Sequence, residues 1–504
     1  MMPRVRSPLS SLSPAAWRLP VLCALLALVS LTARAADVAQ ALQGFDAEVE
    51  ATLRALNVPG AAVGLIQDGQ VVLAKGYGVR EAGKPTPVDA DTIFAVGSIS
   101  KSFTTAVMAT QVDEGKLDWD RPVREYLPDF RMYDPVATEL ITPRDMVVHR
   151  SGLPRHDFIR MSTYLDRAEL VRRIRYMPPS KTFREAYQYN NLMYVAAGYL
   201  SGVLAGSTWE DLVRERLFVP LGMDRSNTSV RDTRRMDNHA LPHELRQGRP
   251  VPVDFYDYQV FGIGPNGAVN STVNDMLKYL RMHLEAGRAQ DGRQVISSEQ
   301  VRELLKPVVV SGPDSTYALA WQKEVRHGDP AWSHGGAITG FTAHMILLPE
   351  HKAGIVVLNN LGSALPARVA QRLADRLLGA AGDTGQYLAT LAKQPTAPSP
   401  SSAEAHAAAP GKAAPASLPL QGYAGTWFHP AYGEIRVEVA GRGLRVVFDA
   451  LQLDLTHDNH DTFRLSYGGF DPLPVQFLLD TAGRAAQMRL PLEPAAPPFV
   501  FERK

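Results

Sequence analysis

Apolar runs of strand length lie near both ends of the first 380 residues, and longer helical segments lie between them. Residues 61–67 and 70–77 are rich in Val, Leu, Ile and Ala, and they are separated by Asp68-Gly69, a pair that readily adopts positive φ and closes a two-residue hairpin. From Ser98 to about residue 290 helical signals dominate, including the segments 98–114 and 274–284. Strand signals return over 317–325, 332–337, 344–348 and 354–359.

This order of elements predicts one sheet assembled from both ends of the region. In the most economical arrangement the early hairpin joins the late strands in a single antiparallel sheet, and the helical region packs on it as a second lobe. A helix with an apolar stripe at Val369, Leu373 and Leu377 follows the last strand. We therefore predict an α+β domain over residues 37–392, with a cleft between its two lobes.

A second domain follows a segment without large apolar side chains. Residues 393–417 consist mainly of Ala, Pro and Ser, so they cannot bury enough surface to offset the entropy of ordering, and we interpret them as a linker. Alternating polar and apolar positions then recur over 434–439, 444–448, 462–467, 475–480 and 486–490, with a turn at 440–443. This rhythm predicts a small all-β domain, a sandwich or a barrel, over residues 418–504.

The first 36 residues have a composition of their own. Three arginines precede an apolar run of about 13 residues, and small residues follow at the positions that a signal peptidase reads. We predict a secretory signal peptide over residues 1–36, cut after Ala35 or Ala36, and an exported protein that is periplasmic or secreted and meets a membrane only during export. An uncleaved anchor is disfavoured because a spanning helix needs ~20 apolar residues, and a lipid anchor at Cys23 because bulky Leu22 precedes it.

Charge and cysteine content exclude several classes of function. The 504 residues include 53 basic and 52 acidic side chains, and this even balance argues against a nucleic acid as partner. The single cysteine, Cys23, lies in the predicted signal peptide, which excludes an internal disulfide, a cysteine nucleophile elsewhere in the chain and zinc sites with paired thiolates. We expect neither a cofactor nor a metal, so the chemistry has to come from other side chains.

The first candidate motif is Ser98-x-x-Lys101, which lies where an extended segment turns into a helix. Residues three apart share a helix face, so the Lys101 amine can reach the Ser98 hydroxyl. The helix N-terminus also favours negative charge on a developing alkoxide. Alone the motif is common, and the plain alternative is an N-cap serine beside a solvated lysine.

Two further motifs carry residue types that would assist such a serine. In Tyr189-x-Asn191 the phenol can shuttle a proton and the amide can orient a lysine or a substrate carbonyl, although a half-buried structural tyrosine is the alternative. His334-Gly335-Gly336 is more informative, because this tripeptide is rare by chance. Two glycines weaken a strand, and the usual reason to tolerate them is a ligand that approaches the backbone closely. The alternative there is a bulge with an exposed histidine.

In this order the three motifs resemble those of the serine β-lactamase and penicillin-binding-protein fold, specifically the class C β-lactamase and DD-peptidase family, which includes S12-type peptidases. The resemblance covers about residues 42–380 and includes the supporting segments 94–97, 141–145, 149–153 and 264–267. The segments 423–427, 432–434 and 461–463 of the C-terminal domain resemble the lipocalin-like barrel of some exported members, among them an archaeal peptidase that acts on peptides containing D-amino acids.

The resemblance implies a role for each motif residue. Ser98 is the nucleophile that forms an acyl-enzyme with a carbonyl substrate. Its base is either a neutral Lys101 or a Tyr189 made acidic by the Lys101 cation, and the sequence does not decide between them. Asn191 holds Lys101 and the substrate amide, while the N–H groups of Ser98 and Ala337 form an oxyanion hole.

One departure from the family's pattern limits the substrate. Dedicated β-lactamases of this family usually have Lys-Thr-Gly where this chain has His334-Gly335-Gly336, and that lysine helps to bind the substrate carboxylate. Histidine is largely neutral at pH 7, so we expect poor penicillin turnover and better activity on esters, amides or peptides containing D-amino acids. His334 is grouped with the catalytic residues, and Gly335, Gly336 and Ala337 with the substrate-binding ones.

Several alternatives accompany this interpretation. The rival function is a catalytically silent penicillin-binding or sensor protein of the same fold.

A Ser/His/Asp triad through His149 is disfavoured, because Gly-x-Ser-x-Gly does not surround Ser98. The stretch 457–461, rich in His and Asp, is interpreted as a turn rather than a metal site. Our hypothesis for the C-terminal domain is that it shields the cleft or builds a homo-oligomer, and the alternative is a tethered module that only adds stability. The natural substrate and the balance between hydrolysis and acyl transfer stay undetermined.

Overall fold

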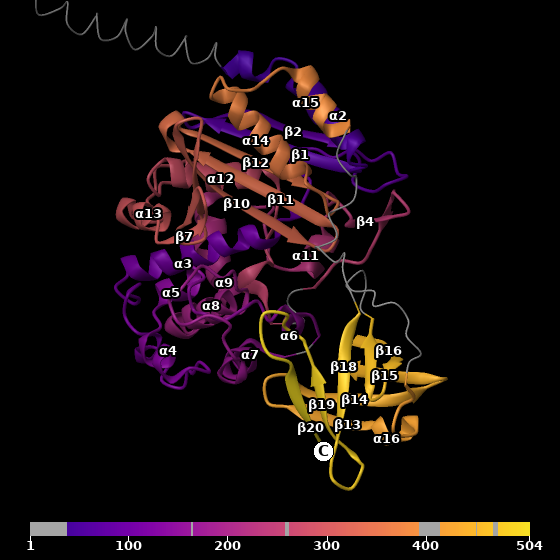
Figure 1. Cartoon of the computed structure of the whole chain (residues 1–504). Helices are drawn as coiled ribbons and strands as arrows, with labels where there is room; N and C mark the ends of the chain where they lie inside the picture. The colour runs from indigo at the N-terminus through magenta and orange to yellow at the C-terminus, as the bar shows by residue number, and fades with distance from the viewer. Residues whose placement is uncertain (1–37, 163–164, 258–261, 393–413, 450, 467–471) are drawn as a thin grey trace, which may run out of the picture.

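The computed structural model describes residues 38–162, 165–257, 262–392, 414–449, 451–466 and 472–504. It has a larger α+β body and a smaller β-barrel beside it (Figure 1). The predicted signal peptide and residues 393–413 of the predicted linker lie outside the described residues. The last linker residues are attached to the barrel, since the Ala414 N–H donates to Asn459 Oδ1 at 2.8 Å and the Ser417 N–H to Asp461 Oδ1 at 2.9 Å.

One antiparallel sheet of eight strands forms the centre of the body, in the order β2-β1-β12-β11-β10-β9-β8-β7. The predicted early hairpin is confirmed: β1 (Gly60–Gln67) and β2 (Gln70–Gly78) are joined by Asp68 and Gly69, both with positive φ. Strand β1 also pairs with β12, almost 300 residues later in the chain, so the sheet does join both ends of the region. The later strands are β7 (Val309–Gly312), β8 (Ser315–Tyr317), β9 (Gln322–Arg326), β10 (Asp329–Ile338), β11 (Phe341–Leu348) and β12 (Ala353–Asn359).

The prediction of one strand over 317–325 is wrong. Tyr317 ends β8 and Gln322 begins β9, and the residues between them form a buried turn in which the Ala318 N–H donates to the Trp321 carbonyl at 2.7 Å. Ala320 there has a φ of 67°. The turn residues are apolar because they are fully buried, and an apolar run of this length does not distinguish a buried turn from a buried strand.

Helices cover both faces of the sheet. Alternate β1 residues Ala61, Val63 and Leu65 belong to the apolar cluster shared with α2 (Phe45–Ala55) and α14 (Leu365–Leu377), the latter being the predicted late helix. Ala62 and Ile66 belong to the other cluster, which includes α12 (Val273–Leu284). Because both faces are covered, β1 is a continuous apolar run and not an alternating one.

The helical lobe is built around α3 (Ser100–Asp113) and α8 (Leu192–Ala205), which contact each other. Almost every α3 side chain is buried although several are hydroxyls, and those hydroxyls donate to backbone carbonyls, as Ser102 does to Ile99 at 2.8 Å. None of the helices within the described ranges has both the length and the apolar character needed to cross a membrane. The remaining helices are α4 (Pro135–Leu140), α5 (Pro143–Val147), α6 (Asp157–Ser162), α7 (Arg167–Arg173), α9 (Trp209–Val213), α10 (Val219–Leu221), α11 (Val230–Arg235), α13 (Ser298–Leu305) and α15 (Thr384–Ala392).

The C-terminal domain is a closed barrel of eight antiparallel strands, which confirms the all-β prediction. The prediction of a turn over 457–461 is only partly right: β16 continues to Asn459, and the turn consists of His460 and Asp461. Aromatic side chains fill the interior, where the Phe477 ring contacts both Tyr423 and Trp427. The strands are β13 (Gly425–His429), β14 (Gly433–Ala440), β15 (Gly443–Phe448), β16 (Leu451–Asn459), β17 (Thr462–Leu465), β18 (Leu473–Leu479), β19 (Ala485–Leu490) and β20 (Phe499–Arg503), after the short helix α16 (Leu420–Tyr423).

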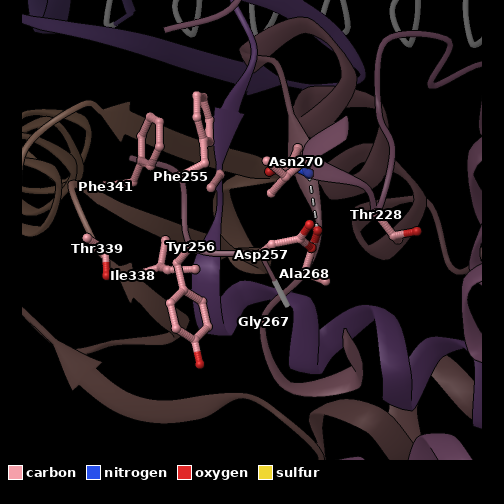
Figure 2. Close-up of a pocket in the computed structure, with 12 residues that line it drawn as sticks. Thr228, Phe255, Tyr256, Asp257, Gly267, Ala268, Asn270, Ile338, Thr339 and Phe341 are labelled. Atoms are coloured by element: carbon pink, nitrogen blue, oxygen red, sulfur yellow. Dashed lines mark hydrogen bonds between the residues drawn. The ribbon is translucent and has the colours of Figure 1, made fainter. Parts of the chain in front are cut away.

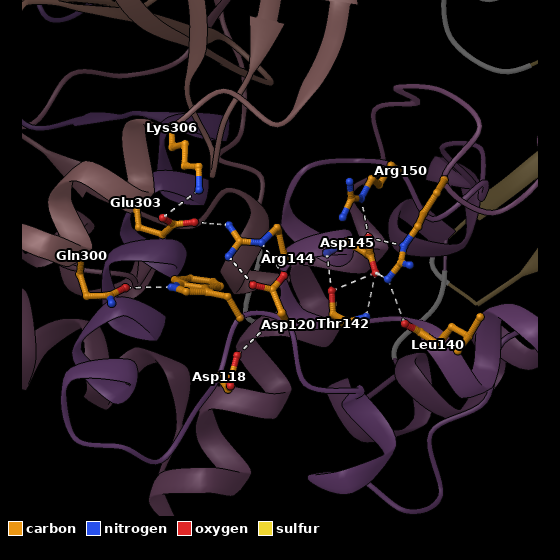
Figure 3. A network of polar contacts seen from close by, with 12 residues as sticks. Asp118, Asp120, Leu140, Thr142, Arg144, Asp145, Arg150, Gln300, Glu303 and Lys306 are labelled. Atoms are coloured by element: carbon orange, nitrogen blue, oxygen red, sulfur yellow. Dashed lines mark hydrogen bonds and ion pairs between the residues drawn. The ribbon is translucent and has the colours of Figure 1, made fainter.

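A buried carboxylate, Asp145, fixes the loops of the helical lobe that face the sheet. It completes a capping box with Thr142 at the start of α5, and it accepts hydrogen bonds from Arg150 and Arg184 (Figure 3). The Arg184 N–H in turn donates to the Arg150 carbonyl at 2.9 Å, and the next loop is tied by the Gln188 N–H to the His149 carbonyl at 2.7 Å. Asp145 therefore holds together two segments that lie far apart in the sequence.

We predict that Asp145→Asn lowers the free energy of unfolding by about 3 kcal/mol, because two arginines lose a buried partner. Burial opposes ionisation of Asp145, but the hydrogen bond from Arg184 and the charge of Arg150 outweigh it and lower its pKa. A lowered folded-state pKa contributes stability that is complete above the ordinary value of 3.8 and is lost as the pH falls through the lowered value. Urea unfolding at several pH values should therefore show wild type and variant converging in acid.

The control for this prediction is Glu50→Gln, which removes the exposed ion pair that Arg54 forms at 3.6 Å. Exposed pairs of this kind contribute at most about 1 kcal/mol, so this variant should unfold almost as the wild type does. The stabilising role of Asp145 would be contradicted if Asp145→Asn lowered the free energy of unfolding no more than the control does. A loss of stability that does not change with pH would contradict it as well.

Candidate active site

The Ser98 hydroxyl lies at the entrance to helix α3, within the hydrogen-bonding reach of Lys101. Ser98 is in a single 3₁₀ turn, Gly97–Ile99, and is half-buried, whereas Lys101 is completely buried. Lys101 Nζ donates to Ser98 Oγ at 3.0 Å and to the carbonyl of Asn266 at 3.0 Å. The alternative of a solvated lysine is therefore wrong.

The carbonyl that binds Lys101 belongs to a segment held by the same helix. Thr104 Oγ1 donates to the Pro265 carbonyl at 2.7 Å, and the Val269 N–H donates to Ser100 Oγ at 2.9 Å. These two contacts flank Asn266. The sequence had flagged 264–267 only as a supporting segment, because a backbone carbonyl that binds a lysine leaves no signal in residue type.

Tyr189 lies next to a lysine, an arginine and a buried imidazole. Its ring centroid is 4.9 Å from Lys101 Nζ, 5.2 Å from Arg155 Cζ and 4.3 Å from the His149 ring. The second half of the motif, Asn191, is buried, and its amide nitrogen donates to Asp157 Oδ1 at 2.8 Å. The structure thus brings Tyr189-x-Asn191 to Ser98-x-x-Lys101, and it adds Arg155 and Asp157, which sequence reasoning missed.

His149 is buried at the centre of a cluster of tyrosines and is neutral. Burial is the main cause that lowers its pKa well below the ordinary value, followed by the charge of Lys101. Its Nδ1 accepts the Asn190 N–H at 3.0 Å, so the ring proton is on Nε2. With Nδ1 holding the backbone between Tyr189 and Asn191, His149 orients the motif.

His334 points inward, and both of its ring nitrogens are occupied. Nδ1 lies 2.6 Å from the Gly335 carbonyl and Nε2 lies 3.0 Å from the Tyr317 hydroxyl, so the neutral ring donates through Nδ1 and accepts through Nε2. Burial, followed by the charge of Lys101, lowers the pKa of His334 to about 3. The alternative of a bulge with an exposed histidine is wrong, since β10 pairs regularly with β11 through this motif.

Gly336 in β10 and Gly97 in the serine turn allow these two backbone segments to lie directly against each other. A Cβ added to Gly336 would lie 1.9 Å from the Val96 carbonyl oxygen and 3.1 Å from the Ser98 nitrogen. A Cβ added to Gly97, whose φ is 53°, would lie 2.7 Å from the Ala337 nitrogen. The amides of Ser98 and Ala337 therefore belong to backbone segments in contact. Gly335 differs, because its Cβ would lie at ordinary contact distances, 3.4 Å from His344 Nδ1 and 3.8 Å from the Ala343 carbonyl oxygen.

These residues line a cavity of about 530 Å³ between the sheet and the helical lobe. Lining it are Ser98, Tyr189, Asn191 and the whole of His334-Gly335-Gly336-Ala337, together with residues not predicted from sequence, including Arg155, Asn266 and Tyr317. Arg155 is the one Arg, Lys, Asp or Glu among these lining residues, and burial lowers the pKa of His344, which also lines the cavity, to about 4. The predicted cleft between the lobes thus contains every predicted site residue except Lys101, which lies beneath its floor.

A second, much smaller pocket lies at the end of β10 (Figure 2). It is lined by Phe255, Tyr256, Ile338 and Phe341 and has a volume of about 10 Å³, which is enough for roughly one water molecule. Gly267 and Ala268, which follow Asn266, form its other wall. It is therefore too small to bind a substrate.

Comparisons with known proteins identify the family of the chain. The Beta-lactamase family model matches residues 45–380, and a domain of unknown function, DUF3471, matches residues 409–503. The unguisins hydrolase ungD' of Aspergillus campestris is 32% identical over 482 residues, which cover 87% of this chain and 83% of that protein. The chain belongs to the Beta-lactamase family.

Other proteins similar to this Beta-lactamase family member are named as a peptidase or as a penicillin-binding protein homologue. A D-aminopeptidase of Cereibacter sphaeroides is 27% identical, over 69% of this chain and 67% of that protein. The octameric penicillin-binding protein homologue from Pyrococcus abyssi shares the fold, with a TM-score of 0.61 at 22% identity over 92% of this chain and all of that one. The predicted fold, with its C-terminal barrel, is confirmed.

We predict that Gly336→Ala in this Beta-lactamase family member lowers the acylation rate about 100-fold, because the new methyl group forces β10 away from the serine turn. The matched control is Gly335→Ala, which adds the same methyl group one residue earlier into ordinary contact distance and should cost less than about threefold. The rate of Ser98 labelling by a fluorophosphonate measures both. Equal losses for the two variants would show that the contact between β10 and the serine turn is unimportant.

Proposed function

We propose that the protein is an exported serine hydrolase that forms an acyl-enzyme through Ser98 and acts on esters, amides or peptides containing D-amino acids. The observation that carries this proposal is the 3.0 Å hydrogen bond between Lys101 Nζ and Ser98 Oγ at the floor of the cavity. A buried amine beside a partly accessible hydroxyl is the arrangement that nucleophilic catalysis requires. Membership of a hydrolase family and relatives named D-aminopeptidase and unguisins hydrolase support it.

The first half of the reaction follows from the positions of these groups. Ser98 Oγ attacks the substrate carbonyl while its proton passes to a base, either a neutral Lys101 or an ionised Tyr189. Negative charge develops on the carbonyl oxygen, and the N–H groups of Ser98 and Ala337 bind it there, each such donor being worth about 3 kcal/mol. The leaving alcohol or amine takes up the proton, which leaves the acyl group esterified to Ser98.

The second half releases the product and regenerates the serine. A water molecule or an amine attacks the ester carbonyl, and the same base takes its proton. The tetrahedral intermediate again places its negative oxygen between the two backbone N–H groups, and collapse returns the proton to Ser98 Oγ. The nature of the attacking nucleophile decides between hydrolysis and acyl transfer.

The cavity favours substrates whose binding does not require a positively charged side chain from the sheet. A lysine at the position of His334 would attract a substrate carboxylate, but this histidine stays neutral at physiological pH because its pKa is about 3. The neighbouring His344 is neutral for the same reason, with a pKa of about 4. Both observations support weak penicillin turnover relative to esters and peptides.

Export and assembly extend the proposal beyond the catalytic body. The composition of residues 1–36 supports a cleaved signal peptide and a periplasmic or secreted location. The octameric state named for the Pyrococcus abyssi neighbour supports homo-oligomeric assembly as a hypothesis for this chain.

We predict that Ser98→Ala abolishes turnover of a panel of nitrophenyl esters, D- and L-aminoacyl amides, D-Ala-D-Ala peptides and nitrocefin, with losses of at least about 10³-fold. Ser333→Ala, which removes another hydroxyl from the same cavity, should retain most of the activity. Fluorophosphonate labelling of Ser98 without turnover of any ester or peptide would favour the silent penicillin-binding or sensor protein. Turnover that survives in Ser98→Ala would refute the acyl-enzyme.

We predict that His334→Lys raises the ratio of nitrocefin to ester kcat/KM about tenfold, because it places a cation where the substrate carboxylate would bind. The control is His334→Gln, which stays neutral and should leave the ratio within about threefold of the wild type. Comparing the ratio rather than either rate removes general losses of activity. An unchanged ratio in His334→Lys, or the same rise in both variants, would show that the charge at this position does not set the preference.

A further inference from the structure

The segment Leu153–Ile159 lies between the catalytic cavity and the C-terminal barrel, and it contacts both. On the barrel side, Phe158 stacks on Phe448 with ring centroids 5.8 Å apart, and the His156 ring meets Phe499 edge-on at 5.8 Å. Figure 1 shows α6, which starts in this segment, beside the barrel. The barrel is thus packed against a loop that reaches the active site.

The polar centre of this contact is the carboxylate of Glu493, in the loop between β19 and β20. Glu493 is buried, and its Oε2 accepts the His156 N–H at 2.7 Å while its Oε1 accepts the Ala495 N–H at 3.0 Å. His156 is itself completely buried and has a φ of 47°, in the left-handed region that is uncommon for residues other than glycine. A charged acceptor on its N–H constrains this backbone position.

The residues on either side of His156 face the catalytic motifs. Arg155 lines the cavity, with Cζ 5.2 Å from the centroid of the Tyr189 ring. Asp157 accepts the Arg155 Nε–H at 2.7 Å and the Asn191 Nδ2–H at 2.8 Å. Three consecutive residues therefore connect the barrel carboxylate to both members of Tyr189-x-Asn191.

We propose that Glu493 is a positioning residue for the active site: by fixing the backbone of His156, the barrel sets the places of Arg155 and Asp157, and through Asp157 that of Asn191. The barrel then completes the catalytic cavity and does more than cover it or join copies of the chain. A displacement of a catalytic group by about 1 Å can lower a rate about 100-fold, so a single hydrogen bond at this distance from the chemistry can matter.

A second contact between the two domains provides a matched control. Arg173, in α7, donates to the Ala431 carbonyl of the barrel at 3.4 Å. Its side-chain hydrogen bonds in the described part of the chain are to Glu169 and Ala431, and none of them reaches residues 153–159. Arg173→Ala therefore weakens the same interface without removing the acceptor of His156.

The first test is hydrogen exchange of the full-length protein, which needs no substrate. We expect Glu493→Ala to speed exchange at least fivefold in peptides covering 153–159 and 189–195, whereas Glu493→Gln, which keeps an acceptor, and Arg173→Ala stay within twofold of the wild type there. Faster exchange confined to the barrel, or an equal increase in Arg173→Ala, would overturn the proposal.

The second test is the kinetics of a nitrophenyl ester with the same variants. We expect Glu493→Ala to lower kcat about tenfold with KM changed less than threefold, Glu493→Gln to recover at least half of kcat, and the thermal midpoints of Glu493→Ala and Arg173→Ala to be similar. Wild-type kcat in Glu493→Ala would refute the positioning role. A wild-type protein without any turnover would refute the proposed hydrolase function instead. Hydrogen exchange would in that case still test whether Glu493 of the barrel fixes the active-site segments.

Discussion

The catalytic centre depends on the burial of one amine. Lys101 loses its hydration completely, so its nitrogen requires protein partners, and it finds the Ser98 hydroxyl, the Asn266 carbonyl and the faces of two tyrosine rings. These partners come from the 3₁₀ turn before α3, the 264–266 turn and α8 with the loop before it. Meeting the requirements of one side chain thereby aligns three distant parts of the chain around the Ser98 hydroxyl.

The sheet contributes backbone more than side chains. Strand β10 lies so close to the serine turn that Gly336 has no room for a methyl group, and this proximity brings the Ala337 and Ser98 segments into contact. The histidine that precedes the glycines is tied at both nitrogens and kept neutral by burial. On the sheet side, the cavity offers polar neutral groups, while its charged lining residue, Arg155, comes from the helical lobe.

The barrel is connected to this centre by a short route. Glu493 holds His156, and the neighbouring Asp157 holds Asn191, so the appended domain and the catalytic motif share one polar chain of contacts. His156 is buried and has a positive φ, and the barrel supplies the acceptor for its N–H. Under the proposal made above, this contact couples the barrel to the active-site loop.

The sequence by itself determined the elements whose residues depend on local physics. Periodicity and turn chemistry predicted the Asp68-Gly69 hairpin, the late strands and the all-β C-terminal domain, and the spacing of Ser98 and Lys101 placed both on one helical turn. The buried turn at residues 318–321 escaped prediction because burial, and not strand geometry, selects its apolar side chains. Tertiary structure alone decided that Asn266 binds the lysine through its backbone, that the Tyr317 hydroxyl donates to His334 and that Glu493 reaches the active-site loop. Such contacts depend on which surfaces meet after folding. A backbone carbonyl, a tyrosine or a loop glutamate looks the same in the sequence whether or not it makes such a contact.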